Sequence, residues 1–106
     1  MYSFDHWADW FSDKVREFDP DRFILIKPHD TRAIPECRLN PSFGLQLDSD
    51  DRIGFIGFWK NGLCDYQVID VRRDLDLANE AGREASDETV KSLFLNFLSF
   101  YGEEVL

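Results

Sequence analysis

Two histidines and two cysteines are the side chains of this sequence that could perform acid–base or nucleophilic chemistry. His29 stands next to Asp30, and a histidine–aspartate pair is half of an acid–base site. Cys37 or Cys64 could act as a nucleophile with His29 as its base. The simpler interpretation is an exposed loop histidine and, for Cys64 in an apolar run, a small buried hydrophobic residue. A small enzyme that uses His29 or Cys37 is therefore the least favoured alternative.

Metal and cofactor signatures are weak. Asp48, Asp50 and Asp51 resemble a fragment of a calcium loop, but the glycine at position six and the glutamate at position twelve are missing. The two cysteines form neither a CxxC motif nor a Cys/His array, and two are too few for a disulfide framework. The chain also has no glycine-rich phosphate loop. The sequence predicts two free thiols, no metal and no cofactor.

Charge restricts the class of partner. The chain has 106 residues, with 21 acidic against 12 basic side chains and a formal charge of −9. Nucleic acids are bound through clustered Lys and Arg, so this balance argues against nucleic acid and against an anionic membrane, and it suits a basic partner. The N-terminus lacks the basic and apolar regions of a signal peptide, and no apolar run approaches the roughly 20 residues of a membrane span. We expect one cytoplasmic domain over residues 1–106.

Helical spacing marks both ends of the chain. The first helix is predicted from Phe4 to Phe18, capped by Ser3 and stopped at Asp19-Pro20. The second is predicted to start at Ser86-Asp87-Glu88 and to stop at Gly102. Large apolar residues recur at three- and four-residue steps in each, namely Phe4, Trp7, Trp10, Phe11, Val15 and Phe18, then Val90, Leu93, Phe94, Phe97, Leu98 and Tyr101.

The segments between the helices favour strands. Residues 22–27 form a short run that is apolar on both faces, typical of a strand buried on both sides, and we expect Pro28 to end it. A loop over 28–35 and a short strand over 36–39 are expected next. Phe43, Leu45 and Leu47 alternate with polar or small residues and predict a clearer strand. Residues 72–86 are polar, with a helical turn expected over 77–81.

The strongest local signal is a hairpin. The runs 53–60 and 63–71 flank Asn61-Gly62, which suits a two-residue type I′ turn that would pair Trp59 with Cys64. This register predicts a core face of Ile53, Phe55, Trp59, Cys64, Tyr66 and Val68. The other face would be only partly covered and would hold Ile56, Phe58 and Ile69 among Lys60, Asp65 and Gln67. Gly54 and Gly57 are expected to leave room for neighbouring aromatic rings. The predicted fold class is α+β, with an N-terminal helix, an antiparallel sheet of four to five strands and a C-terminal helix.

Acidic residues gather around this hairpin. They either form an ordinary solvated surface or complement a basic protein, whose capture such complementarity would accelerate. A nuclease is the natural candidate, since its cleft must be basic and carboxylates could occupy the places of phosphates. The candidate partner-binding residues are Asp48, Asp50, Asp51, Asp65, Asp70, Asp74 and Asp76, with Phe58 as an apolar anchor.

The hairpin sequence GFWKNGLCDYQVID, residues 57–70, resembles that of the TriTu immunity proteins of polymorphic toxin and contact-dependent growth inhibition systems. The similarity extends from the first helix, with its two tryptophans, to the C-terminal helix. The resemblance implies a cytosolic, non-catalytic antidote that binds one secreted toxin domain one-to-one and blocks it, and some such toxins are RNases. The alternative is an acidic secretion chaperone, also small and α+β. Such a chaperone would be a dimer, whereas an immunity protein is expected to be a monomer when free.

Overall fold

The computed structural model describes residues 2–102, and its elements follow one another as a helix, five strands and a second helix. Short 3₁₀ helices η1 and η2 interrupt the two connections that flank the first strand. The bounds are α1 Phe4–Arg16, η1 Pro20–Arg22, β1 Leu25–Asp30, η2 Pro35–Cys37, β2 Ser42–Asp48, β3 Arg52–Trp59, β4 Leu63–Asp70, β5 Leu75–Glu84 and α2 Val90–Ser99.

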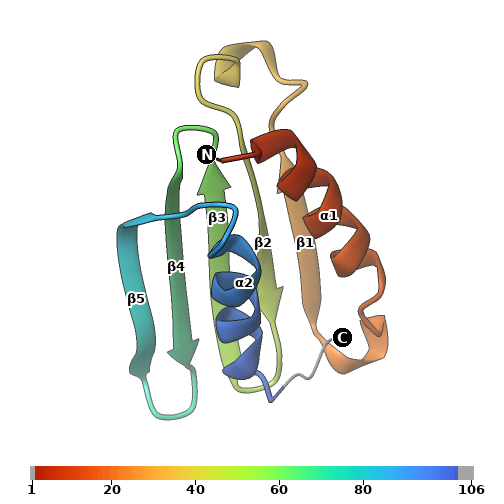
Figure 1. The fold of residues 1–106 in the computed structure, drawn as a ribbon. Coiled ribbons are helices and arrows are strands. Elements are labelled where there is room, and N and C mark those ends of the chain that lie inside the picture. Colours follow the sequence, from red (N-terminus) through yellow and green to blue (C-terminus); the bar gives the residue numbers. More distant parts are fainter. Residues whose placement is uncertain (1, 103–106) are drawn as a thin grey trace.

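The five strands form one antiparallel sheet in the order of the chain, β1-β2-β3-β4-β5. Figure 1 shows that α1 and α2 both cover the same side of this sheet, α1 nearer β1 and α2 nearer the middle strands. The predicted α+β class with terminal helices is therefore confirmed. Both helices of residues 2–102 lie on one side of the sheet, so no helix of this part of the chain covers the other face.

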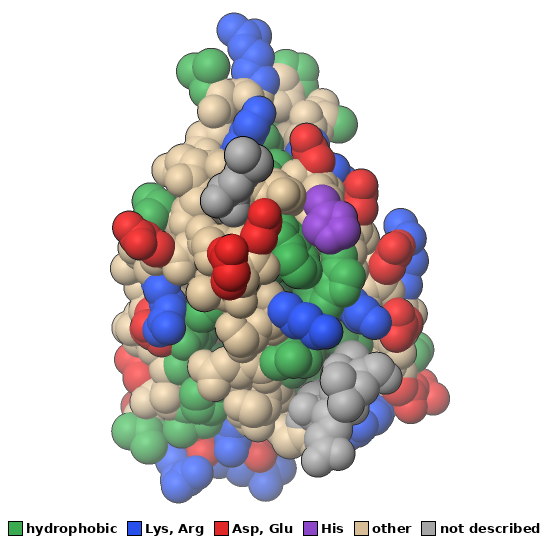
Figure 2. Space-filling model, viewed as in Figure 1, with side chains coloured by type: hydrophobic (Ala, Val, Ile, Leu, Met, Phe, Trp, Pro, Cys, Tyr) green, Lys and Arg blue, Asp and Glu red, His purple; other side chains and the backbone are tan. Residues whose placement is uncertain are grey.

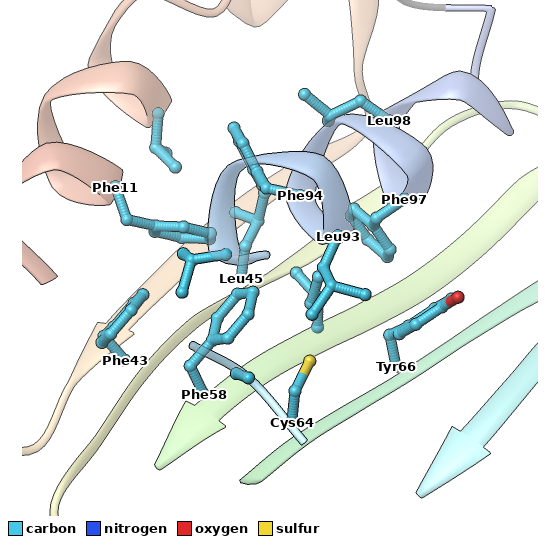
Figure 3. Close-up of a cluster of buried hydrophobic side chains, with 14 of the residues drawn as sticks. Phe11, Phe43, Leu45, Phe58, Cys64, Tyr66, Leu93, Phe94, Phe97 and Leu98 are labelled. Carbon is cyan, nitrogen blue, oxygen red and sulfur yellow. The ribbon is translucent and has the colours of Figure 1, made fainter. Parts of the chain in front are cut away.

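Aromatic side chains join the two helices to the sheet. The ring centroid of Phe11 in α1 lies 5.3 Å from that of Phe43 in β2 and 4.7 Å from that of Phe94 in α2. Phe58 of β3 completes the group, 5.1 Å from Phe43. Figure 3 shows these rings gathered between the helices and the sheet. Phe94 and Phe97 are buried, as the helical spacing predicted.

The hairpin differs from the prediction by one residue. Phe58 pairs with Cys64, so three residues rather than two connect β3 to β4. The Gly62 amide donates to the Trp59 carbonyl at 2.9 Å, and Gly62 has φ +90°. Asn61 does not have the positive φ that a type I′ turn requires at both central positions. The predicted two-residue turn and its register are therefore wrong.

This single step exchanges the two faces of β3, because side chains alternate along a strand. Ile56 and Phe58, expected on the partly covered face, are completely buried. Ile53 and Phe55, expected in the core, keep 41% and 36% of their surface exposed. Trp59 is half-buried. The β4 residues predicted for the core were placed correctly, and Cys64, Tyr66 and Val68 are buried.

The first strand begins later than expected and is not buried on both sides. β1 runs from Leu25 to Asp30 and includes Pro28, which was predicted to end it. β1 is an edge strand that pairs only with β2, and proline is tolerated at an edge because an outward-facing N–H is not needed there. Ile24 lies just before the strand and is largely exposed. The expected loop therefore starts at Thr31 instead of Pro28.

Two other segments were assigned the wrong secondary structure. Residues 36–39, predicted as a strand, overlap the 3₁₀ helix η2. Residues 77–81, predicted as a helical turn, lie inside β5, the ten-residue strand that pairs with β4. β5 has weak strand character in its sequence, so the backbone hydrogen bonds offered by β4 decide its conformation.

Hydrogen bonds to Asp87 link the start of α1 to the segment that precedes α2. Its Oδ1 accepts hydrogen bonds from the Ser3 amide at 2.7 Å and from Trp7 Nε1 at 2.8 Å, and its Oδ2 accepts one from Ser3 Oγ. α2 itself begins at Val90, later than the predicted start at residues 86–88. Ser3 makes no side-chain cap to its own helix. Ser3 and Asp87, which the sequence placed at the starts of two separate helices, therefore bond to each other.

Asp87 is expected to make stability depend on acid. Its hydrogen bonds from Ser3 and Trp7 hold the pKa of the carboxyl below its usual value of 3.8. The pKa of Asp87 is thus lower in the folded than in the unfolded protein. The resulting stabilisation is present above about pH 4 and is lost as the pH falls through the pKa of the folded protein. Asp87→Asn should unfold at a lower denaturant concentration at pH 7 and show a weaker loss of stability on acidification. Equal pH profiles for the variant and the wild type would contradict this role.

Candidate functional site

The adjacent His29 and Asp30 do not form an acid–base pair. Successive side chains of a strand point to opposite faces, so the two residues of β1 diverge. Asp30 accepts hydrogen bonds from Arg32 Nε and Nη2, and this guanidinium lowers the pKa of the carboxyl. His29 instead stacks on Phe55, with ring centroids 5.8 Å apart and an interplanar angle of 8°. Burial lowers the pKa of His29.

The two cysteines are free thiols with different environments. Cys64 is completely buried against the helices, and burial raises the pKa of its thiol to about 12. A thiol with such a pKa holds almost no thiolate at neutral pH, so it is a poor nucleophile. Cys37 lies in η2 and is half-buried. Cys64 is therefore a packing residue, as the simpler interpretation held.

Thiol labelling should separate the two cysteines. At pH 7 the disulfide reagent DTNB is expected to modify Cys37 readily in the folded protein and Cys64 only when the protein unfolds, at least about 100-fold more slowly. Labelling rates measured on Cys37→Ser and on Cys64→Ala show which cysteine reacts quickly and which reacts slowly. Rapid labelling of Cys64 in the folded Cys37→Ser protein would contradict the buried position.

Within residues 2–102, no group of three or more His, Cys, Asp or Glu side chains is placed to hold a metal ion. This applies to Asp48, Asp50 and Asp51, whose sequence resembles part of a calcium loop.

Over the same part of the chain, no helix is long and apolar enough to cross a membrane.

Most of the predicted carboxylates gather at one end of the sheet. The β2–β3 and β4–β5 turns lie side by side at the lower end in Figure 1, and the Val71 amide donates to the Asp51 carbonyl at 3.0 Å. Asp74 sits in the second turn with φ 53°, a conformation that Asp and Asn tolerate better than most residues. We call this surface the acidic end and define it by Asp48, Asp50, Asp51, Asp70, Asp74 and Asp76.

Arginines already neutralise part of the acidic end. Arg52 Nη1 lies 3.2 Å from both Asp51 Oδ2 and Asp70 Oδ2, and Arg73 Nε donates to Asp70 at 2.8 Å. The Asp70 side chain is only 4% exposed, and these contacts lower the pKa of its carboxyl. Asp70 therefore serves the fold. Asp50, Asp74 and Asp76 are the exposed members of the set.

Two predicted residues lie elsewhere. Asp65 pairs with Gly57 toward the other end of the hairpin, and its Oδ1 accepts a hydrogen bond from the Gly82 amide at 2.6 Å. Phe58 is completely buried under the helices, so it cannot be the exposed apolar anchor. Its assignment to a partner-binding surface is wrong for the same reason that the hairpin register was wrong.

Two other groups were missed in the sequence. Arg32 lies between three carboxylates, with Nη2 2.8 Å from Asp9 and 2.7 Å from Asp30 and Nη1 3.4 Å from Asp5. No local spacing could reveal this group, because it joins α1 to the loop after β1. Figure 2 shows that acidic and basic side chains are interspersed on the helix-covered side.

The second missed group is on the uncovered side of the sheet. We call it the open face and define its apolar part by His29, Ile53, Phe55, Trp59, Leu63 and Ile69, which alternate with core residues along β1, β3 and β4. Apolar residues at successive positions of 53–59 were a signal that both faces of this strand carry large side chains.

A protein-family model described as Immunity protein TriTu matches residues 5–100. Searches of curated proteins and of solved structures returned no significant match. The match runs from the first turn of α1 to the end of α2, so it covers both helices and every strand of the sheet. The chain therefore belongs to the TriTu family of immunity proteins.

Proposed function

We propose that this protein neutralises one cognate toxin by binding it one-to-one and covering a basic active-site cleft, and that it performs no catalysis. Membership of an immunity protein family over residues 5–100 carries this proposal. The toxin is a nuclease, most simply an RNase delivered by contact-dependent growth inhibition, and the antidote acts in the cytoplasm as a free monomer.

Charge supports the choice of a basic target. The chain carries −9 overall. Asp50 and Asp74 lie exposed in two adjoining turns, and Asp76 lies exposed at the start of β5. Opposite charges accelerate encounter and suppress binding to wrong partners. A nuclease cleft that binds phosphates offers the complementary field. We expect the acidic end to meet the rim of the cleft, where exposed carboxylates guide the approach.

The test is binding kinetics with the toxin domain encoded next to this protein. A triple variant, Asp50→Asn, Asp74→Asn and Asp76→Asn, removes the exposed carboxylates and leaves Asp70 with its arginines. The matched control, Asp13→Asn, Glu36→Gln and Glu88→Gln, changes net charge equally at exposed positions elsewhere. The first variant should associate about 10-fold more slowly at low salt, with a flatter salt dependence.

Two results would contradict the proposal in different ways. Equal association rates for the two triple variants would show that only net charge matters and that the acidic end is not the contact. A wild-type protein that neither binds the toxin domain nor protects an RNA substrate from it would overturn the proposed function. Toxin activity on RNA, measured with and without the protein, decides whether the target is a ribonuclease.

A further inference from the structure

β3 is apolar on both faces, although the helices of residues 2–102 cover only one of them. Ile56 and Phe58 point into the core, while Ile53, Phe55 and Trp59 point to the open face. A strand with large apolar residues on both sides is typical of a sheet that is covered on both sides. An antiparallel sheet with one wet face normally alternates apolar with polar residues. The open face of β3 therefore has the composition of a surface that becomes covered.

Three rings on this face lie over a pair of glycines. Gly44 of β2 pairs with Gly57 of β3. A Cβ atom on Gly44 would lie 2.5 Å from the His29 ring, and one on Gly57 would lie 2.9 Å from Phe55 and 3.2 Å from Trp59. The rings therefore lie close against the backbone of the two glycines. They form an apolar row along the surface of the sheet and do not project far into solvent. Such a row can fit against a partner with little loss of side-chain freedom, since it is already packed.

Polar groups frame the row. Phe55 lies between Gln46 and Gln67 on the neighbouring strands. Asp48 stands beside Ile53 at one end, and Asp65 stands beside Gly57 further along β4. An apolar centre inside a polar rim is the usual anatomy of a protein interface, and aromatic residues at its centre carry much of the binding energy. The carboxylates at this rim select a partner that surrounds its own apolar residues with Lys or Arg.

We propose that the cognate toxin docks on the open face, with Phe55 as its central anchor and Asp48 and Asp65 meeting cationic side chains. This inference rests on the proposed function and adds the contact surface to it. A second copy of this chain is the other conceivable occupant, but two chains that each carry −9 repel one another. The open face adjoins the acidic end at Asp48, so one basic partner can reach both surfaces.

The decisive variant is Phe55→Ala, compared with Leu39→Ala. Both remove an exposed large apolar side chain, but Leu39 lies in the loop before β2 and is not one of the residues that define the open face. Both proteins should remain folded, as thermal unfolding can verify. With the purified toxin domain as probe, Phe55→Ala should raise the dissociation constant about 30-fold or more, through faster dissociation at an unchanged association rate. Leu39→Ala should bind like the wild type.

The outcomes separate this inference from the proposed function. If the wild type binds the toxin and Phe55→Ala binds equally well, the open face is not the docking surface, whereas the immunity function stands. If the wild type does not bind the toxin at all, the proposed function fails first. A wild-type dimer in light scattering that Phe55→Arg converts to a monomer would assign the open face to self-association and overturn the proposal.

Discussion

Replacing Phe58 with alanine is expected to lower the free energy of unfolding by about 3–5 kcal/mol, the usual cost of removing a buried phenylalanine. Phe58 is completely buried, and its ring centroid lies 5.1 Å from that of Phe43 and 6.1 Å from that of Phe11. Alanine would leave a cavity where α1 meets the sheet (Figure 3), and the neighbouring rings cannot all move to fill it.

Phe55→Ala is the matched control, because it removes the same side chain three positions earlier on the opposite face. Phe55 is 36% exposed and its ring stacks on His29, so we expect a loss of about 1 kcal/mol or less. Denaturant unfolding of the two variants measures the difference directly. If Phe55→Ala lowered the free energy of unfolding more than Phe58→Ala, the result would support the register of a two-residue hairpin turn and contradict the structure.

Gly44→Ala is expected to cost about 3 kcal/mol, at the upper end of the range for overpacking. A Cβ atom there would lie 2.2 Å from the Ile56 carbonyl oxygen and 2.8 Å from the Gly57 Cα. Both are backbone atoms of the neighbouring strand, so they cannot rotate away and the strands would have to separate. The measurement is again the midpoint of denaturant unfolding.

Gly57→Ala provides the comparison from the same cross-strand pair. Its closest neighbours are ring atoms of Phe55 and Trp59, at 2.9 to 3.2 Å, and side-chain atoms can shift more easily than the backbone atoms next to Gly44. Alanine also loses less backbone entropy than glycine in a strand, by roughly 0.5–1 kcal/mol, which offsets part of the clash. We expect a net loss of about 1 kcal/mol or less. Equal losses at the two glycines would show that the strands do not approach as closely at Gly44.

Features with a short sequence period could be predicted from the sequence. Phe94 and Phe97 recur at a spacing that places them on one helix face, and both are buried. The alternation of Phe43, Leu45 and Leu47 marks β2, and all three are buried. The segment from residue 57 to residue 70 carried the resemblance to the immunity proteins, and the family match over residues 5–100 agrees with it. The negative net charge of the chain also follows directly from the sequence.

The tertiary structure decided which residues meet solvent. One extra residue in the β3–β4 connection exchanged Phe58 for Phe55 as the exposed ring, because a strand alternates with a period of two. From the sequence alone, the register can be predicted only from the type of turn that Asn61-Gly62 favours. In the folded protein, the register also depends on which face of the strand the helices cover. Asp70 was equally ambiguous, since its contact with Arg52 depends on the pairing of β4 with β3.

The sequence by itself therefore determined the class of the molecule: an acidic α+β immunity protein with terminal helices. Tertiary structure alone assigned β5, the contact of Asp87 with Trp7 and the open face. The physical reason is the separation along the sequence between the residues that interact. Helix periodicity and charge depend on residues a few positions apart, whereas strand pairing and burial depend on partners that the chain brings together from distant positions.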